Sequence, residues 1–156
     1  MWKTAWRLAA LLFVCTSGGP VLAQENPPVL PREIRDWMAR DQVRRWAVLL
    51  TQGDSLFNSG TCQRCHEEGG TGSVRAPDLT DTEWVQSDGS LEGIRQTIFW
   101  GVRRRDLSDP SLRFEMNPAG GMHLEWEEYE ALAAYVWSLS NGSHLPVRRS
   151  GGGGLW

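Results

Sequence analysis

The chain has 156 residues, of which 40% are hydrophobic, and a formal net charge of −3. This length suits one modest domain and is too short for two comfortable ones. The mildly acidic balance, without a long block of basic residues, argues against a protein that binds nucleic acid.

Residues 1–23 have the layout of a secretory signal peptide. Lys3 and Arg7 precede an apolar run at residues 8–14, and Ala23 ends a small-residue cleavage site. The run is shorter than the roughly 20 residues needed to span a bilayer. We therefore expect a cleaved signal, no membrane span in the mature chain, and a periplasmic or other extracytoplasmic location.

Residues 24–48 are expected to form an N-terminal extension that is partly helical. Its first part, residues 24–31, is rich in proline, and apolar residues then recur three and four apart. This spacing is typical of an amphipathic helix, or a pair of them, reaching to about Phe57. Trp37 and Trp46 lie in the extension, where we expect them to cap the core or to contact a partner.

Cleavage of the signal peptide would remove Cys15 and leave two cysteines, Cys62 and Cys65. Together with His66 they form the pattern C-x-x-C-H. Residues three and four apart share one side of a helix. Both sulfurs can therefore bond the vinyl groups on one haem edge while His66 projects its imidazole onto the iron. The motif predicts one covalently attached haem c.

Other interpretations of the motif remain open at this point. A redox-active cysteine pair needs a strand–helix–strand context, which residues 50–70 do not offer. A structural zinc site needs a second, closely spaced ligand pair, whereas His123 and His144 are 21 residues apart. A chance occurrence of the pattern is the third alternative, and the motifs that follow bear on it.

The segment after the motif predicts a loop and two helices. A Gly-rich loop occupies residues 67–78, and Thr80 to Glu83 has the spacing of a capping box, which predicts a short helix. Ser90 is the expected cap of the next helix. The buried face of that helix would consist of Leu91, Ile94, Ile98 and Val102.

The last part of the chain predicts a loop, a helix and a tail. The loop covers residues 106–123, and the helix covers residues 125–139. Residues 141–156 are expected to form a flexible Gly-rich tail. No segment of the chain shows a convincing strand pattern.

Five groups of residues occur together in the order found in one family, the class I cytochromes c, and the chain most closely resembles their short bacterial members. The resemblance covers residues 49–140. It implies an all-α cytochrome c fold, with four to five helices around one covalently attached haem. Besides the haem motif, it rests on Gly53-x-x-x-Phe57, Ala76-Pro77-Asp78-Leu79-Thr80, Ile94-x-x-x-Ile98-x-x-Gly101, Met116 before Pro118-Ala119-Gly120-Gly121, and Leu132-Ala133-Ala134-Tyr135-Val136.

The resemblance also implies a methionine as the second axial ligand, on the loop before the last helix. Met116 stands 19 residues before Tyr135, close to the family's position, whereas Met122 stands only 13 before it. The family usually has proline directly after this methionine, and here Asn117 follows Met116. Met122, and His123 in a bis-histidine arrangement, are therefore kept as alternatives to Met116.

Four further residues are assigned supporting roles by the resemblance. Pro77 matches the loop proline whose neighbourhood supports the proximal histidine, His66. In that neighbourhood a backbone carbonyl accepts the other N–H of the imidazole. Arg75 and Trp84 are candidate donors to the haem propionates. Trp100 is a candidate wall of the haem pocket.

The resemblance implies an electron carrier that is not itself an enzyme. Its expected partners are redox proteins, namely a dehydrogenase, an oxidase or another cytochrome. A first alternative is a cytochrome subunit held tightly in a dehydrogenase or oxidase complex, with residues 24–48 as its docking element. A second is a haem enzyme or gas sensor with an open axial site.

Overall fold

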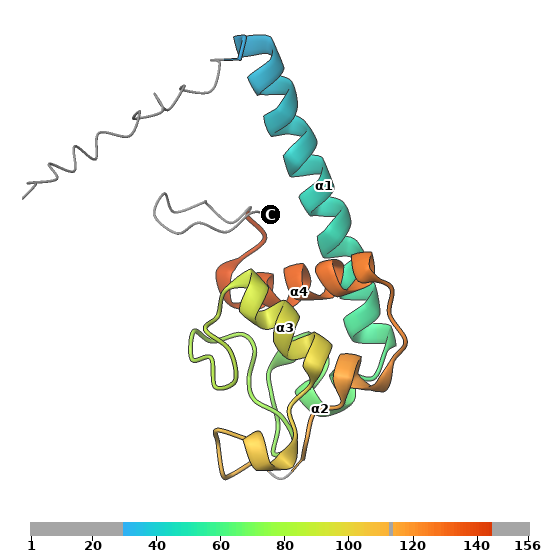
Figure 1. Ribbon diagram of the computed structural model, residues 1–156, viewed down its shortest axis with the longest axis vertical. Coiled ribbons are helices and arrows are strands. Elements are labelled where there is room, and N and C mark those ends of the chain that lie inside the picture. Colours follow the sequence, from blue (N-terminus) through green and yellow to red (C-terminus); the bar gives the residue numbers. More distant parts are fainter. Residues whose placement is uncertain (1–29, 113, 145–156) are drawn as a thin grey trace, which may run out of the picture. The chain divides into compact units, whose positions relative to one another are not determined.

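The computed structural model describes residues 30–112 and 114–144, so the expected signal peptide and the tail from residue 145 lie outside the described residues. No strand occurs in these two ranges, and the all-α prediction is confirmed (Figure 1). The α-helices are α1 (Arg32–Ser59), α2 (Gln63–His66), α3 (Leu91–Trp100) and α4 (Trp126–Asn141), with 3₁₀ turns at Glu68–Gly70, Arg104–Asp106 and Pro118–Gly121.

α1 is one continuous helix that crosses the expected domain boundary between residues 48 and 49. It follows Pro31 and ends at Gly60, whose backbone N–H donates to the carbonyl of Leu56 at 3.1 Å. The sequence left open whether one or two helices form here, and one forms. The only interior glycine, Gly53, is a weak helix former but does not interrupt it.

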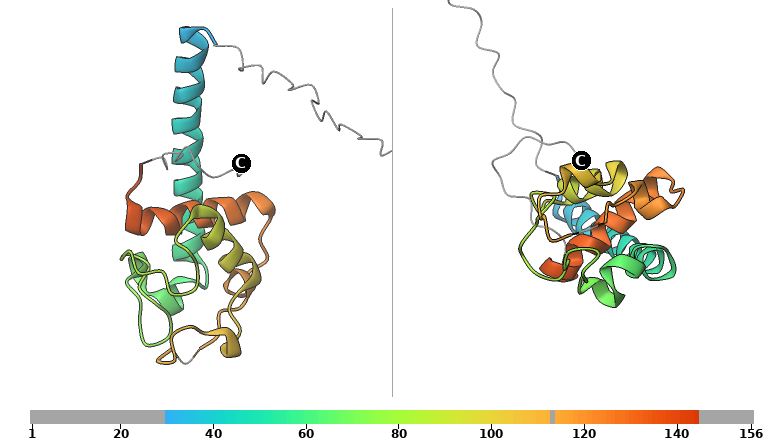
Figure 2. Two further views of the ribbon diagram at one scale, coloured as in Figure 1. Left: turned by 60° about the vertical axis from the view of Figure 1, so that its left-hand side comes forward. Right: turned by 90° about the horizontal axis from the view of Figure 1, so that it is seen from below.

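α1 and α4 cross each other (Figures 1 and 2). Gly53 lies at the crossing, beside Ala131 and Tyr135. A Cβ atom at this position would collide with the backbone oxygen of Ala131, so glycine allows the two helices to approach closely. One turn further along α1, Phe57 packs against Tyr135 with a ring-centroid distance of 5.4 Å. The Gly and aromatic residues of the first helix thus meet the last helix.

Trp46 provides a second contact between α1 and the end of α4. It is 7% exposed, its ring centroid lies 5.8 Å from that of Trp137, and its Nε1 donates to the carbonyl of Ser143 at 3.0 Å. Trp37, nine residues earlier on α1, is 57% exposed. Of the two tryptophans in the extension, therefore, Trp46 caps the domain and Trp37 does not.

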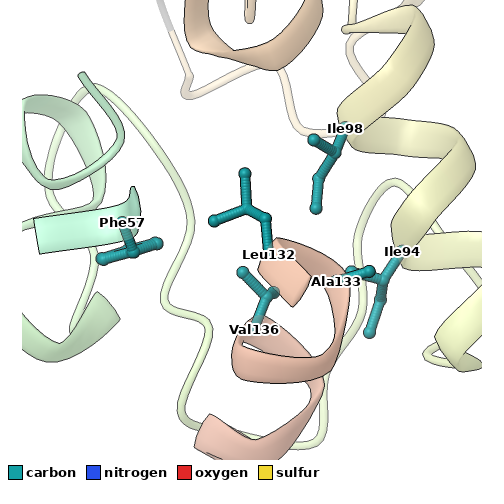
Figure 3. Packing of buried hydrophobic residues seen from close by; sticks show 6 residues of the cluster. All are labelled: Phe57, Ile94, Ile98, Leu132, Ala133 and Val136. Atoms are coloured by element: carbon teal, nitrogen blue, oxygen red, sulfur yellow. The ribbon is translucent and has the colours of Figure 1, made fainter. Parts of the chain in front are cut away.

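The core lies where α1, α3 and α4 meet. Figure 3 shows Leu132 of α4 between Phe57 of α1 and Ile98 of α3. Phe57 and Leu132 are each 1% exposed. The buried cluster consists of Phe57, Ile94, Ile98, Leu132, Ala133 and Val136.

The short helix expected after Thr80 does not form. Instead, Asp78 accepts hydrogen bonds from the backbone N–H and hydroxyl of Thr80 at 2.7 and 2.6 Å, and Asp81 accepts one from the N–H of Glu83 at 2.9 Å. These local bonds stabilise turns, because short acidic side chains compete with the backbone for the same N–H groups. The capping-box spacing therefore predicted a helix wrongly.

α3 begins as predicted and ends earlier than expected. The Ser90 hydroxyl accepts from the N–H of Gly93 at 2.9 Å, as a helix cap does. The helix stops at Trp100 because Gly101 turns the chain with a φ of +67°. Val102 was expected on the helix face but lies beyond the helix, although it is buried.

Candidate haem-binding site

A mainly apolar pocket opens between all four helices and the loops that follow α2 and α3. The residues of the C-x-x-C-H motif line it together with Met116. Phe57, Ile94, Ile98, Leu132 and Val136 supply part of its apolar wall. All residues of the core cluster in Figure 3 except Ala133 therefore also line this pocket.

The motif folds as a single helical turn, α2. The N–H groups of Cys65 and His66 both donate to the carbonyl of Cys62, at 3.1 and 3.0 Å. The two cysteines are free thiols and half-buried. Burial raises the pKa of the Cys62 thiol, with a smaller contribution from Cys65 in the same direction. The turn therefore brings two unpaired sulfurs and one imidazole to one pocket.

His66 is oriented by the loop after the motif. Its Nδ1 lies 3.0 Å from the carbonyl oxygen of Pro77, the contact expected of a proximal histidine. Burial lowers the pKa of His66, and the bond to Pro77 opposes this shift in part. With Nδ1 bonded to a carbonyl, the neutral ring keeps Nε2 for a metal.

The Gly-rich loop is tied back onto the motif at two points. The N–H of Gly72 donates to the carbonyl of His66 at 2.8 Å, and the hydroxyl of Ser73 donates to the carbonyl of Cys65 at 2.6 Å. Gly72 has a φ of +75°, and a Cβ there would lie 2.5 Å from the backbone nitrogen of Asp78. The glycine thus allows the loop to turn tightly and carry Pro77 to His66.

Of the three candidate distal ligands, the structure brings only Met116 to the pocket. Met122 and His123 are not among the lining residues. Met122 packs against the core cluster without lining the pocket, and its sulfur lies 2.5 Å from where a Cβ on Gly60 would stand. Met116 pairs with Val102 through two backbone hydrogen bonds of 2.8 and 2.9 Å. This pairing fixes the backbone from which the Met116 side chain departs.

The supporting residues separate into two groups. Arg75 and Trp84 line the pocket, and the Arg75 guanidinium also lies over the ring of Phe114, 5.9 Å from its centroid. Gly89, with a φ of +73°, packs directly against the Trp84 indole. Trp100, in contrast, is 72% exposed and does not line the pocket, so the expectation that it forms a wall was wrong.

Sequence reasoning missed some residues that shape the pocket. Leu112 and Phe114 line it from a loop whose composition carries no periodic signal. Thr61 lies directly before the motif, and its hydroxyl donates to the carbonyl of Gly120 at 2.6 Å. A contact between residues so distant in the chain has no local signature that a spacing rule could detect.

The pocket fits haem c by the chemistry of its donors. Two free thiols, one imidazole and one thioether surround an apolar space, which matches the groups that attach and ligate such a haem. In the described ranges, no group of three or more His, Cys, Asp or Glu residues could hold a metal ion, so the zinc alternative finds no support there.

No helix within residues 30–112 and 114–144 is both long and apolar enough to cross a membrane.

Comparison with known proteins gives a consistent result. Residues 48–136 match the family described as cytochrome c oxidase, cbb3-type, subunit III. The FixP subunit of the cbb3-type cytochrome c oxidase of Sinorhizobium medicae is 35% identical over 114 residues, which cover 72% of this chain and 37% of FixP. The CcoP subunit from Cereibacter sphaeroides is 29% identical over 94 residues, 59% of this chain and 31% of CcoP.

The fold and the pocket define a class I c-type cytochrome domain. The chain belongs to the cbb3-type cytochrome c oxidase subunit III family. Such cytochromes carry electrons, as expected. Because the relatives are named as oxidase subunits, they agree better with the first alternative, a subunit held in a complex, than with a free carrier. The chain spans about a third of the length of the curated relatives it matches. No solved structure is significantly similar to it.

Proposed function

We propose that the protein is an extracytoplasmic cytochrome subunit of an oxidase complex, carrying one electron at a time on a single haem c. Cys62 and Cys65 hold the haem covalently, and His66 and Met116 ligate its iron. The observation that carries the proposal is the single pocket that contains both thiols, the imidazole and the thioether. The subunit role is supported by the relatives, which are named as oxidase subunits.

The bound haem would supply the one-electron chemistry of its iron, and residues of the chain would hold it and orient its ligands. Pro77 orients His66 and keeps its Nδ1 engaged, so that Nε2 faces the pocket as a neutral ligand. A thioether from Met116 favours the reduced iron. If His66 and Met116 both held the iron, the protein would leave no ligand position for a substrate. Electron transfer without catalysis is the function this ligand set supports.

Arg75 and Trp84 are proposed to bind the haem propionates. Both line the pocket, and each carries an N–H donor. The Trp84 indole is held in place by Gly89, which can pack against it because it has no side chain. Removing the donor by Trp84→Phe should weaken the hold on the propionate while keeping the aromatic wall.

The first half of α1 is proposed as the surface that docks on the rest of the complex. Ile34, Trp37 and Met38 recur at helical spacing, and each is about half exposed. Arg40 and Arg44 are on the same half of the helix, and neither forms an ion pair in the described part of the chain. This surface suits a partner helix that presents apolar and acidic side chains.

Haem attachment is tested by producing the protein with the bacterial haem-attachment machinery. We expect one added haem mass per chain that survives extraction with acidified acetone. Cys62→Ala combined with Cys65→Ala should abolish the attachment. A haem that extracts from the wild type, or a second haem on the same chain, would contradict the proposal.

Docking is tested by following the haem-stained band of native membrane extracts. Trp37→Glu should release the cytochrome from the oxidase band, because it places a charge in the apolar stripe. Trp100→Glu is the matched control, since Trp100 is also exposed but lies on α3. Equal release of both variants, or release of neither, would show that α1 is not part of the interface.

A further inference from the structure

One long-range side-chain hydrogen bond joins the turn that follows Met116 to the haem-attachment site. The hydroxyl of Thr61 donates to the carbonyl of Gly120 at 2.6 Å, across 59 residues of sequence. A Cβ on Gly120 would lie 2.7 Å from that hydroxyl and 3.7 Å from the sulfur of Cys62. The turn at Pro118–Gly121 therefore lies directly on the attachment site.

The same turn has a strained backbone. Ala119 has a φ of +50° although it carries a side chain, and it is 1% exposed. Gly120 follows with a φ of +63°. A non-glycine residue in this left-handed region is unfavourable and persists only where its surroundings impose it. The contacts that can impose it here include the bond from Thr61.

We propose that Thr61 is a positioning residue for Met116: its hydroxyl holds the strained turn closed and thereby keeps the thioether on the iron. The proposal rests on Met116 being the distal ligand. Met116 is fixed on one side by its pairing with Val102. Beyond Asn117 on its other side, Pro118–Gly121 is joined to the attachment motif through Thr61. Without this bond the turn keeps its own backbone hydrogen bonds and its packing against Gly101 but loses its link to the attachment motif, and Met116 becomes easier to displace.

Titration of the ferric haem protein with imidazole, which would displace Met116 from the iron, tests the proposal. Thr61→Val removes the hydroxyl and keeps the shape of the side chain, whereas Thr61→Ser keeps the hydroxyl. Loss of one hydrogen bond weakens the form in which Met116 ligates the iron, and imidazole competes with that form. Imidazole should therefore bind about fivefold to tenfold more tightly. We expect this gain, with a lower reduction potential, in Thr61→Val, and wild-type values in Thr61→Ser.

The control is Thr51→Val, since the Thr51 hydroxyl donates to the carbonyl of Ala47 on the exposed side of α1, away from the pocket. A similar gain in Thr51→Val would show a general loosening and overturn the proposal. Should Thr61→Val fail to fold, Gly120→Ala disturbs the same contact from the other side and should give the same gain.

Unchanged imidazole affinity in Thr61→Val would overturn the positioning role, because Val102 alone would then hold Met116. The ligation itself is checked separately by Met116→Ala. If that variant binds imidazole no better than the wild type, Met116 is not the ligand. In that case the proposed ligand set fails, and the role of Thr61 fails with it.

Discussion

Both halves of α1 carry apolar residues at helical spacing, but the two halves have different surroundings. Around Gly53 the apolar side of the helix packs on α4, and Phe57, one turn later, lines the proposed haem pocket. Around Ile34 and Trp37 an apolar side of the same helix remains exposed. Figure 1 shows the first half of α1 extending beyond the other helices. Helical periodicity shows that a segment can bury a face, and it does not show which surface will cover that face.

Trp46 marks the change between the two halves. It is the first α1 residue from the N-terminus that is buried, and its indole bonds to the backbone after α4. Substitutions placed before and after this residue should therefore have very different effects on stability. The following substitutions run from the largest expected effect to the smallest.

Phe57→Ala should cost the most. The ring is 1% exposed and contacts both Tyr135 and the region of His66. Truncating a buried phenylalanine costs about 3–5 kcal/mol of the free energy of unfolding. Chemical denaturation of the haem-loaded protein measures the loss. A cost below about 1 kcal/mol would mean that this half of α1 is not part of the core.

Gly53→Ala should come next. The added Cβ would collide with the backbone oxygen of Ala131, and neither helix can yield without shifting its neighbour. Overpacking of this kind costs about 1–3 kcal/mol. At a helix site with free space, glycine to alanine would instead stabilise the protein, so the sign of the change reports the crossing. A raised melting temperature would argue against close contact with α4.

Trp46→Phe should have an intermediate effect. The substitution keeps an aromatic ring beside Trp137 and removes the N–H that donates to Ser143. The loss of one partly buried hydrogen bond costs about 1 kcal/mol. Thermal unfolding would show a small decrease, and hydrogen exchange should increase at the end of α4. No change in either would show that the bond does not join α1 to α4.

Trp37→Ala should change the stability of the isolated protein least. Its side chain is 57% exposed, and surface substitutions stay within about 0.5 kcal/mol. The same denaturation experiment as for Phe57→Ala measures it. A loss as large as that of Phe57→Ala would mean that the first half of α1 is covered within this chain, leaving no surface for a partner.

The sequence predicted the site better than the connections within it. The proposed haem attachment needs two cysteines and a histidine on one short turn, and the structure places the motif on such a turn at the pocket. Turns are less predictable, since Asp78 and Asp81 bond to nearby N–H groups where a capping box predicted a helix. The pairing of Val102 with Met116 and the bond from Thr61 to Gly120 depend on tertiary packing and leave no local pattern.

The identity of the distal ligand tests the central claim most directly. A methionine sulfur on ferric haem gives a weak charge-transfer band near the red edge of the visible spectrum, and ferrous NMR places its methyl protons far upfield. Both signals should be present in the wild type, vanish in Met116→Ala and persist in Met122→Ala, because Met116 lines the pocket and Met122 does not. Signals that vanish instead in Met122→Ala, or wild-type ferrous protein that binds carbon monoxide readily, would contradict the account.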